Sequence, residues 1–511
     1  MLFANLPEEL LWHIFATYFG RDSHTLVLLA TLNKRFHRIT TPILYSHVTL
    51  SLVEGDESRK VRRFIMSVFS SPYLAQCVRS LNLNELSWVP HQSLSRRRKE
   101  LVARIMAGDI LGRPDRLDMF KLVTVVRRLP LSEKLKHKWC AELQEVTPSL
   151  DSLIALLFVF LPSLEKLESN WSLDPMYIWR LLPQADMRKV ESSPSPSPSP
   201  SPSPFVLRNL THLKVNSETP CGNSSEIIPL LQMPSLTHFF GSNWGPIRRD
   251  GGDDGVESRA KGLRSQSGKG ASSIMHLELR HCNVDLHSLR TILKYCRSVR
   301  TFIFHRDWDP RVHVNLSGAS LTKALRPLRK TLENIALHFE PGLYIHQESE
   351  IHPLDLSQFS VLANIHVAAG YLIHDPEDFD SYEFSKTYDS EAEKEPINVP
   401  IYDRMPESLE VLRITGFSTP QQLRFLLEDC CGMLQHRPRF PRLRELSIEA
   451  DFDDADTAFD MRALQQEAHS AEVVFRKINT AALPDEEVDL PTPAGCNWGM
   501  DGEFKWSTKL F

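Results

Sequence analysis

Histidines and carboxylates, the side chains that most often perform acid–base or metal chemistry, are numerous in this sequence but follow no catalytic spacing. The sequence has no H-E-x-x-H, no G-x-S-x-G and no paired cysteines of the kind that bind zinc. The stretch "SGKG" is not a phosphate loop, because no Gly sits five residues before Gly268 and Gly270 replaces the Ser or Thr. The acidic run "DFDDADTAFD" misses the Ca²⁺-loop pattern. We therefore expect no enzymatic activity, no cofactor and no bound metal.

Arg280, His305 and His338 form a second arrangement of residues that could support chemistry. These residues occupy equivalent positions in successive copies of an apolar motif, L-x-x-L-x-L. If the copies form adjacent strands, the three side chains would stack as a ladder, which would suit a metal-binding or pH-sensing site. Three aligned polar residues among ten copies can also arise by chance. We favour an ordinary polar surface over a site for chemistry.

Composition and charge argue against two classes of partner. The chain has 511 residues, a net charge of −5 and 42% hydrophobic residues, which is ordinary for a globular protein. That charge gives no overall attraction to nucleic acid or to an anionic membrane. The start lacks a basic secretory signal, and the longest apolar run, Ser152–Leu164, is too short to cross a bilayer. Eight scattered cysteines without a C-x-x-C pair indicate a reducing compartment, so we expect a cytoplasmic or nuclear protein.

The first residues of the chain predict a short amphipathic helix. In "LPEELLWHIFATYF", Pro7 fits the first helical turn, where its missing N–H costs nothing. The two glutamates that follow are favourable at a helix N-terminus. The expected apolar stripe consists of Leu10, Ile14 and Phe15, flanked by Leu11 and Tyr18.

Two further short helices are expected before residue 50. Ser23 can cap a second helix through "HTLVLLATL", and Asn33 can begin a third through "KRFHRIT" that ends at Pro42. Three helices in about 40 residues bury too little surface to be stable alone. They must therefore dock on the rest of the chain or on a partner, and one interpretation is a helical cap on the following domain.

Residues 5 to 50 also resemble an F-box. The resemblance rests on the Leu-Pro start, the Ile-Phe pair, the Leu-rich second helix, the basic and aromatic third helix and the exit "PILYSHVTL". Asn33 stands where many F-box proteins have Cys, a position that varies among them. The resemblance implies that this segment binds a Skp-family adaptor and, through it, a cullin. The residues expected at the adaptor contact are Leu6, Pro7, Leu10, Ile14, Phe15, Leu28 and Phe36.

The motif L-x-x-L-x-L, with other apolar residues allowed, recurs along the rest of the chain. Its copies begin at Val78, Leu164, Leu210, Leu236, Ile274, Val299, Leu332, Leu362, Leu409 and Leu443. Two copies fail at the last apolar position, with Ser169 and Gly241. Their spacing is irregular, and the set resembles leucine-rich repeats with insertions. The resulting fold class is α/β, with a three-helix F-box followed by an irregular leucine-rich-repeat solenoid.

In such a repeat, each strand buries alternate residues toward helices on the convex side, and the residues between them face the concave side. The concave residues expected from the motif are Asn82, Lys214, Asn216, Glu278, Arg280, His305, His338, His366, Arg413, Thr415 and Glu449. Their mixed polarity suits a protein-binding surface, and equally a solvated sheet face. Of these, we expect Arg280, His305, His338 and Arg413 to contact a target. Cys282, next to this surface, is expected to be a buried structural thiol.

Biased segments divide the chain. We expect an F-box at 1–50, repeats at 51–450, and a cap helix with an extended tail at 451–511. Disordered or low-complexity insertions are expected at about 192–204, 245–273 and 374–400, the first being an alternating Ser-Pro run that favours polyproline II. The stretch "DTAFDMRALQQEAHSAEVVFRKI" has helical spacing and is expected to cap the last repeat.

An F-box followed by leucine-rich repeats resembles the substrate receptors of Skp–cullin–F-box ubiquitin ligases. The resemblance implies that the chain holds the adaptor at one end and an unknown protein target at the other, while the E2 and RING partner perform the transfer. The alternative is an interaction scaffold whose N-terminal helices only cap the repeats. A cryptic enzyme would need a convergent polar cluster that the sequence does not reveal.

Overall fold

We describe the chain from a computed structural model. The structure describes residues 6–20, 22–50, 57–83, 116–129, 131–145, 149–171, 177, 207–217, 222–247, 272–306, 316–339, 353–373, 399–417, 419–450, 452 and 457–479. Two compact units divide the chain, one formed by Met1–Gly222 with Glu226–Asn243, the other by Asn223–Ser225 with Trp244–Phe511. We call them unit 1 and unit 2 and describe each by itself.

Unit 1 is an α/β array that begins with a group of three helices. Its elements are α1 Glu8–Phe19, α2 Ser23–Leu32, α3 Lys34–Ser46, β1 His47–Thr49, α4 Glu57–Ser70, α5 Pro72–Cys77, β2 Ser80–Leu83, α7 Arg116–Arg128, α8 Glu133–Leu143, α9 Leu150–Phe160, β3 Lys166–Trp171, β4 His212–Ser217, α11 Ile228–Leu231 and β6 His238–Ser242. Its described strands pair in parallel in the order β1-β2-β3-β4-β6.

Unit 2 repeats the same alternation of strand and helix. Its elements are β8 His276–Arg280, α13 Leu286–Tyr295, β9 Thr301–Arg306, α14 Gly318–Leu325, η5 Arg326–Leu328, β10 Asn334–Phe339, β11 Asn364–Ala368, η6 Ala369–Tyr371, α16 Ile401–Arg404, β12 Val411–Thr415, α17 Pro420–Gln435, η8 Arg437–Arg439, β13 Glu445–Ala450, α18 Thr457–Ser470 and β14 Val474–Asn479. Its described strands are parallel in chain order, β8 to β14. Around the division of the chain lie β5 Gly222–Asn223, η4 Ser224–Glu226 and β7 Trp244–Gly245.

The apolar motif sets both the strands and their register. Each of the ten copies leads into a strand that begins two residues after the first motif position, and all ten first positions are 0% exposed. The second apolar positions of neighbouring copies are register partners within each unit, as for Leu81 with Leu167 and Phe302 with Ile335. Because a one-residue slip would turn these side chains outward, the buried pattern fixes the register. The expected α/β solenoid is confirmed.

At the start of the strands, one backbone carbonyl repeatedly accepts two hydrogen bonds from the next repeat. The carbonyl of Arg300 accepts hydrogen bonds from two successive N–H groups, those of Glu333 and Asn334, at 2.8 and 2.9 Å. The carbonyl of Ala363 does the same for Glu410 and Val411, at 2.7 and 3.0 Å. Each repeat is thus tied to the next before the ladder of strand hydrogen bonds begins. This arrangement satisfies backbone donors that would otherwise be buried without partners.

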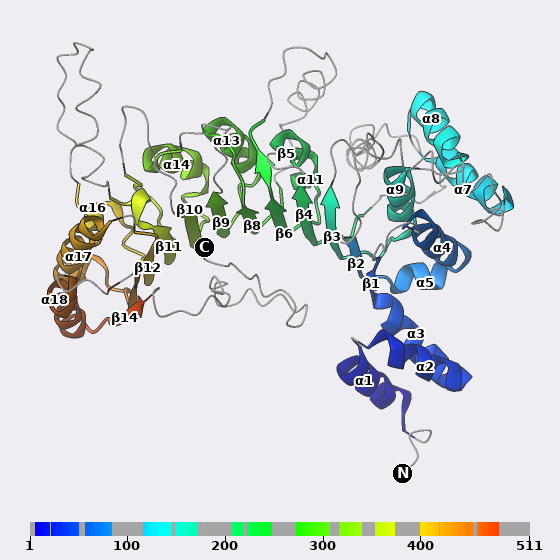
Figure 1. Cartoon of the computed structure of the whole chain (residues 1–511), viewed down its shortest axis with the longest axis horizontal. Helices are drawn as coiled ribbons and strands as arrows, with labels where there is room; N and C mark the ends of the chain where they lie inside the picture. The colour runs from blue at the N-terminus through cyan, green and yellow to red at the C-terminus, as the bar shows by residue number, and fades with distance from the viewer. Residues whose placement is uncertain are drawn as a thin grey trace, which may run out of the picture. The chain divides into compact units, whose positions relative to one another are not determined.

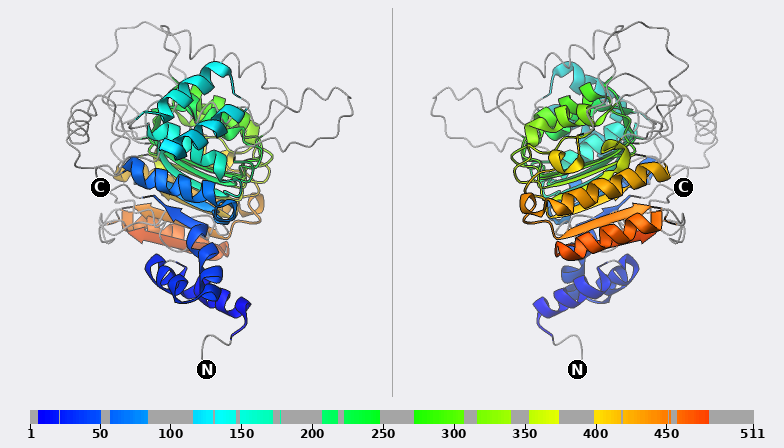
Figure 2. Two further views of the ribbon diagram at one scale, coloured as in Figure 1. Left: turned by 90° about the vertical axis from the view of Figure 1, so that its right-hand side faces the viewer. Right: turned by 90° about the vertical axis from the view of Figure 1, so that its left-hand side faces the viewer.

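The helices of unit 2 lie on one face of its strands, as Figures 1 and 2 show for α13, α14, α17 and α18. Their starts are capped by side chains: Asp285 accepts from the N–H of Ser288, and Thr419 accepts from that of Gln422. Such caps satisfy donors that the first helical turn leaves open. We call the opposite face of the unit 2 sheet the inner face.

The N-terminal helices differ from the expectation in two details. Asp22, not Ser23, caps α2, and its carboxylate accepts a 3.0 Å bond from the N–H of Thr25. Asn33 caps α3 as expected. Pro42 lies inside α3 and does not end it. The hydroxyl of Thr41, which precedes Pro42, donates a hydrogen bond to the carbonyl of His37. A side-chain donor therefore contributes to the hydrogen bonding of this helical turn.

The stack also extends beyond the expected repeats. The strand β1 precedes the first motif copy and pairs with β2, and β14 follows the last copy and pairs with β13. The prediction of one helix through Ile478 was therefore wrong in its second half, since α18 ends at Ser470 and β14 begins at Val474. Val474, Phe475 and Ile478 are β-branched or aromatic residues that suit a strand, and the helical spacing of the preceding residues hid this signal.

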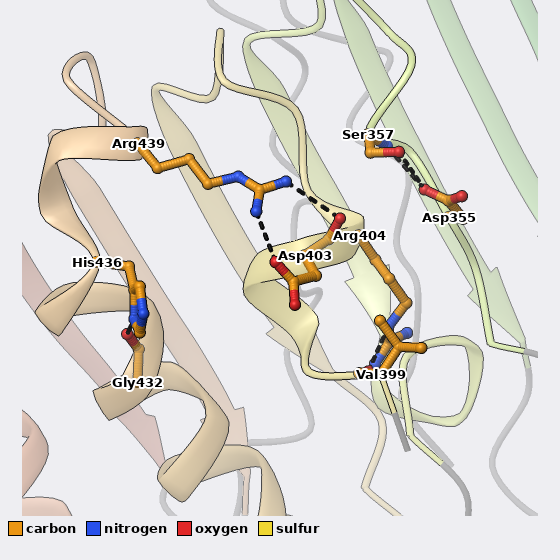
Figure 3. A network of polar contacts seen from close by, with 8 residues as sticks. All are labelled: Asp355, Ser357, Val399, Asp403, Arg404, Gly432, His436 and Arg439. Atoms are coloured by element: carbon orange, nitrogen blue, oxygen red, sulfur yellow. Dashed lines mark hydrogen bonds and ion pairs between the residues drawn. The ribbon is translucent and has the colours of Figure 1, made fainter. Parts of the chain in front are cut away.

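A buried arginine ties down the chain around the longest acidic insertion. Arg404 of α16 is 6% exposed, and its guanidinium donates to the carbonyls of Val399 and Leu372 at 2.9 and 2.8 Å and to that of Leu354 at 3.4 Å. Figure 3 shows this side chain reaching Val399, beside the Arg439–Asp403 ion pair that links η8 to α16. Insertion residues 374–398 lie between two of these carbonyls in the chain and outside the described residues.

Other expected segments also lie outside the described residues. These are all of 192–204, nearly all of 245–273, and the tail after Asn479. Among the helices that the structure describes, none is long and apolar enough to span a membrane. Cys282 is fully buried, as expected of a structural thiol, and its Sγ lies 3.1 Å from the carbonyl oxygen of Arg280.

Candidate interaction surfaces

The three N-terminal helices enclose a core of their own. The buried side chains of this core are Leu11, Phe15, Leu26, Phe36, Ile39 and Ile43. The rings of Phe15 and Phe36 meet edge to face with centroids 5.4 Å apart, which joins α1 to α3. The expected apolar stripe of α1 was therefore wrong in its centre: Leu11 and Phe15 face the core, whereas Leu10 does not.

Ionic and backbone contacts reinforce this small core. Glu8, at the start of α1, forms ion pairs with Arg38 and Arg35 of α3, the latter at 3.5 Å. The guanidinium of Arg35 also donates to the backbone carbonyl of Leu6. These contacts hold the chain just before α1 against α3. Pairs at such exposed positions add little stability on their own, so the apolar core must carry most of it.

The predicted adaptor residues divide into two groups. Phe15 and Phe36 lie in the core, and Leu6 and Ile14 are half-buried against it. Pro7, Leu10 and Leu28 are exposed, Leu10 by 51% and Leu28 by 53%. Only the second group, with the outer edges of Leu6 and Ile14, can meet a partner directly. The core residues would act by holding that surface in place.

Several exposed apolar side chains were missed from the sequence. Trp12, Tyr18, Val27 and Leu32 on α1 and α2 are each about half exposed or more. On α2, Leu32 lies one helical turn from Leu28 and so shares its side of the helix. The only signal in the sequence was the large number of apolar residues on these two short helices, more than one small core can bury. We call Pro7, Leu10, Trp12, Val27, Leu28 and Leu32 the N-terminal apolar surface.

The inner face of unit 2 is polar and mostly buried. The predicted ladder is found in part, since His305 of β9 is the register partner of His338 of β10. The neighbouring row joins His366 of β11 to Arg413 of β12. The ring of His338 also meets that of His366, with centroids 4.1 Å apart and the planes at 82°. The predicted pair His305–His338 thus lies along one row of the sheet, and the contact of His338 with His366 crosses to the neighbouring row.

Burial of the inner face contradicts the idea of a freely solvated sheet. Glu278, Arg280, His338, His366 and Glu449 are all at most 9% exposed. His305 and Arg413 are half-buried and remain accessible. Of the four predicted target residues, only these two can therefore touch a partner without rearrangement, and Arg280 and His338 lie beneath the surface.

A buried carboxylate organises one end of this face. Glu278 of β8 forms an ion pair with Arg280 and lies 3.2 Å from Nε2 of His276. Burial opposes the ionisation of Glu278, but the hydrogen bond from His276 and the charge of Arg280 outweigh it and hold the pKa of Glu278 below its usual range. At the other end, Arg413 pairs with Glu449 at 2.5 Å. Charges on this face therefore largely neutralise one another.

The two inner histidines are held neutral. Burial, aided by the positive charges of His305, Arg280 and Arg413, lowers the pKa of His338 to about 3. Burial, the adjacent ring of His338 and the charge of Arg413 also lower the pKa of His366 well below its usual value. Among the described residues, neither Nε2 atom has a hydrogen-bond partner. Two neutral rings with open nitrogens can give or accept a hydrogen bond, but they carry no charge at neutral pH.

The corresponding face of unit 1 carries a ladder of paired polar groups. Glu168 accepts from Nδ2 of Asn82 at 3.3 Å and forms an ion pair with Lys214. Asn216 donates to Asn170 at 3.0 Å and accepts from the hydroxyl of Ser242 at 2.7 Å. These contacts run from strand to strand, so the predicted residues Asn82, Lys214 and Asn216 stabilise the sheet on which they lie.

A comparison with protein-family models identifies the fold. A leucine-rich repeat domain matches residues 127–468, which is more than half of the chain. The chain belongs to the leucine-rich repeat domain family. No curated protein matches it in a sequence comparison. The family match covers nine of the ten motif copies, from Leu164 to Leu443, and leaves the N-terminal helices to be interpreted from their own geometry.

A leucine-rich repeat domain indicates protein–protein interaction, and the polar inner face is chemically suited to it. Within the part of the chain that the structure describes, no group of three or more His, Cys, Asp or Glu side chains is placed to hold a metal ion. The histidines of the inner face pack ring against ring instead. The described residues thus offer two surfaces of different kinds, one apolar on the N-terminal helices and one polar on the leucine-rich repeats.

Proposed function

We propose that this protein is the substrate-recognition subunit of a Skp–cullin–F-box ubiquitin ligase. In this proposal α1–α3 form the F-box and bind a Skp-family adaptor, through which the chain joins a cullin. The leucine-rich repeats bind a protein target. The chain catalyses nothing itself, because the E2 and RING partner transfer ubiquitin while this subunit holds the target near them. It would work in the cytoplasm or the nucleus.

The N-terminal apolar surface is the observation that carries the proposal. A helical cap would turn its apolar side chains toward the repeats and leave a polar exterior. Here α1–α3 fill their own core, and Leu10, Trp12 and Leu28 remain about half exposed. Figure 1 shows α1 and α2 beyond α3, the helix that leads into β1. An exposed apolar group of this kind suits a partner that covers it.

The repeats support the second half of the proposal. His305 and Arg413 are the accessible members of the predicted target residues, and Arg280 and His338 support them from below. An arginine already paired with a buried carboxylate is fixed in orientation, which lowers the entropy lost when a partner binds. We therefore expect His305 and Arg413 to contact the target and Arg280 and His338 to position them.

The decisive experiment is co-purification of the full chain with the Skp adaptor. We expect the wild-type chain to retain the adaptor and the variant Leu10→Ala/Leu28→Ala to lose most of it. Both residues are exposed, so their truncation removes contact area without opening the core. The variants Phe15→Ala and Phe36→Ala are unsuitable as primary tests, because they would unfold the helices instead.

The matched control is Met275→Ala/Phe425→Ala. These side chains are also exposed apolar residues, but they lie in unit 2. The control variant should bind the adaptor as the wild-type chain does. A folded wild-type chain that retains no adaptor would contradict the ligase proposal and leave a leucine-rich repeat scaffold with an N-terminal helical cap.

A further inference from the structure

Six cationic side chains line an open depression on the helical side of unit 2. They are Arg290 and Lys294 of α13, Lys323 of α14, Arg326 of η5, and Arg329 and Lys330 in the turn that follows. The remaining lining residues are Ala324 and Pro327. The lining therefore contains no acidic and no aromatic side chain. We call these six cations the basic depression.

The cations of the basic depression are not neutralised. All six are exposed, and none of their side chains forms an ion pair or hydrogen bond with another described residue. Other surface arginines of unit 2 do have acidic partners: Arg439 lies 2.6 Å from Asp403, and Arg444 lies 3.6 Å from Glu410. The depression thus gathers six such cations in one place without an acidic side chain in its lining.

Local structure does not require so many like charges together. Lys294 and Lys323 stand in the last turns of α13 and α14, where a cation is favourable to the helix dipole. Arg326 follows at the C-cap of α14 and gains likewise, whereas Arg290, Arg329 and Lys330 gain little from that effect. Arg290 and Lys294 are four residues apart on one helix, a spacing at which like charges repel. Unit 2 therefore keeps a repulsive cluster that an anionic partner would relieve.

We propose that the basic depression binds an acidic polypeptide segment, that is, a stretch of chain rich in Asp and Glu. Binding to single-stranded nucleic acid normally uses aromatic side chains on which bases stack, and none lines this depression. Insertion into a membrane surface uses exposed apolar side chains, and among the described residues no exposed large hydrophobic side chain lines it either. Closely spaced carboxylates on an extended chain need only the charges that are present.

This inference is independent of the proposed ligase function, since it concerns neither the N-terminal apolar surface nor the inner face. The chain as a whole has a net charge of −5, so an acidic segment would not be attracted without a local concentration of cations. The attraction should weaken steeply with added salt, because all six charges are exposed.

The test is a fluorescence anisotropy titration of the full chain against a fluorescein-labelled polyglutamate peptide at low ionic strength. A Gly-Ser peptide of equal length serves as the uncharged probe. We expect saturable binding of polyglutamate only. The variant Arg326→Glu/Arg329→Glu should weaken it by about tenfold or more, since two attractive charges become repulsive. Its melting temperature should change little, because the relief of like-charge repulsion offsets the loss of a cation at the C-terminus of α14.

The matched control is Arg442→Glu/Arg462→Glu, which makes the same change in net charge at two exposed arginines of unit 2 outside the depression. It should bind polyglutamate nearly as the wild-type chain does. Equal weakening by both variants would overturn the proposal, and so would a lack of polyglutamate binding. Tighter depression-dependent binding of a single-stranded DNA oligomer, or of phosphatidylserine vesicles, would assign the surface to another class of partner and equally overturn it.

Discussion

The N-terminal helices and the inner face of unit 2 differ in which side chains they bury and which they expose. The helices bury a few large apolar side chains, such as Phe15 and Phe36, and leave others, such as Leu10 and Trp12, in solvent. The inner face buries charged and polar groups, with Glu278 only 2% exposed, and satisfies many of them by pairing. One region has an apolar exterior, and the other has a polar interior.

This difference predicts two kinds of association. Covering the N-terminal apolar surface gains free energy in proportion to the area removed from water, at about 25 cal/mol per Å², with few polar groups to desolvate. A partner on the inner face must compete with existing ion pairs, so it gains less from area and more from matching hydrogen bonds. The N-terminal apolar surface therefore suits a partner that is the same in every complex, and the inner face suits a partner that is selected by its hydrogen-bonding groups.

The largest expected effect comes from emptying the N-terminal core. Phe15→Ala removes the ring that joins α1 to α3 and should cost about 4 kcal/mol of the stability of these helices. Hydrogen exchange of the full chain should show lost protection in α1–α3. Protection in β8–β14 should not change, because unit 2 has its own core. Loss of protection in both units would show that the helices stabilise the repeats, as a cap would.

The second effect tests the buried charges of the inner face. Glu278→Gln keeps the shape of the side chain but leaves Arg280 and His276 without their anion, and should lower the free energy of unfolding by about 3 kcal/mol. Urea titration measures it. Glu333→Gln is the control, because Glu333 pairs with Arg300 at 3.6 Å at an exposed position and should cost at most about 1 kcal/mol. Similar losses in the two variants would contradict the distinction between buried and exposed pairs.

A third, smaller effect concerns Arg404. Arg404→Met keeps a long apolar stem but leaves the carbonyls of Leu372 and Val399 without this donor, at a cost of about 2 kcal/mol. Arg439→Met removes the more exposed ion pair with Asp403 beside it (Figure 3) and should cost less than half as much. Thermal unfolding compares the two variants. A larger loss of stability in Arg439→Met than in Arg404→Met would contradict the expectation that the more buried arginine contributes more.

The sequence predicted the repeated elements well because their signal is physical and local. Every copy of the motif produced a strand, even the copies with Ser169 and Gly241, since the register is set by all the apolar positions together. The two terminal strands were missed for complementary reasons. β1 has only three residues, and β14 follows a helix whose period masked the change of pattern.

The candidate surfaces were less predictable, because exposure depends on tertiary packing. A periodic pattern located the face of α1 approximately, but it could not show that Leu11 fills the core and Leu10 does not. Likewise, the motif placed His338 and His366 on the inner face without revealing their burial or their diagonal contact across strands. Those properties depend on neighbours that are distant in sequence.

The smallest expected effect is a pH dependence from His338. Its pKa is about 3 in the folded chain and near 6.5 when unfolded, so the unfolded chain binds the additional proton between these values. The stability associated with the neutral ring is therefore complete above pH 6.5 and is lost as the pH falls toward 3. Between pH 7 and 5.5 the loss from this ring should be about 1 kcal/mol.

Urea titrations of wild-type chain and His338→Gln at several pH values measure this term. The variant cannot take up the proton, so its stability should fall less between pH 7 and 5.5, by about 1 kcal/mol. His287→Gln, at an exposed position on α13, should retain the wild-type pH dependence. If the free energy of unfolding fell equally with pH in wild type and His338→Gln, protonation of the His338 ring would cost no stability. The inner face would then be more hydrated than its burial indicates. A smaller fall in the free energy of unfolding in His338→Gln would confirm that water is excluded from the His338 ring on the polar inner face of unit 2. The apolar surface of the N-terminal helices, in contrast, is exposed to solvent.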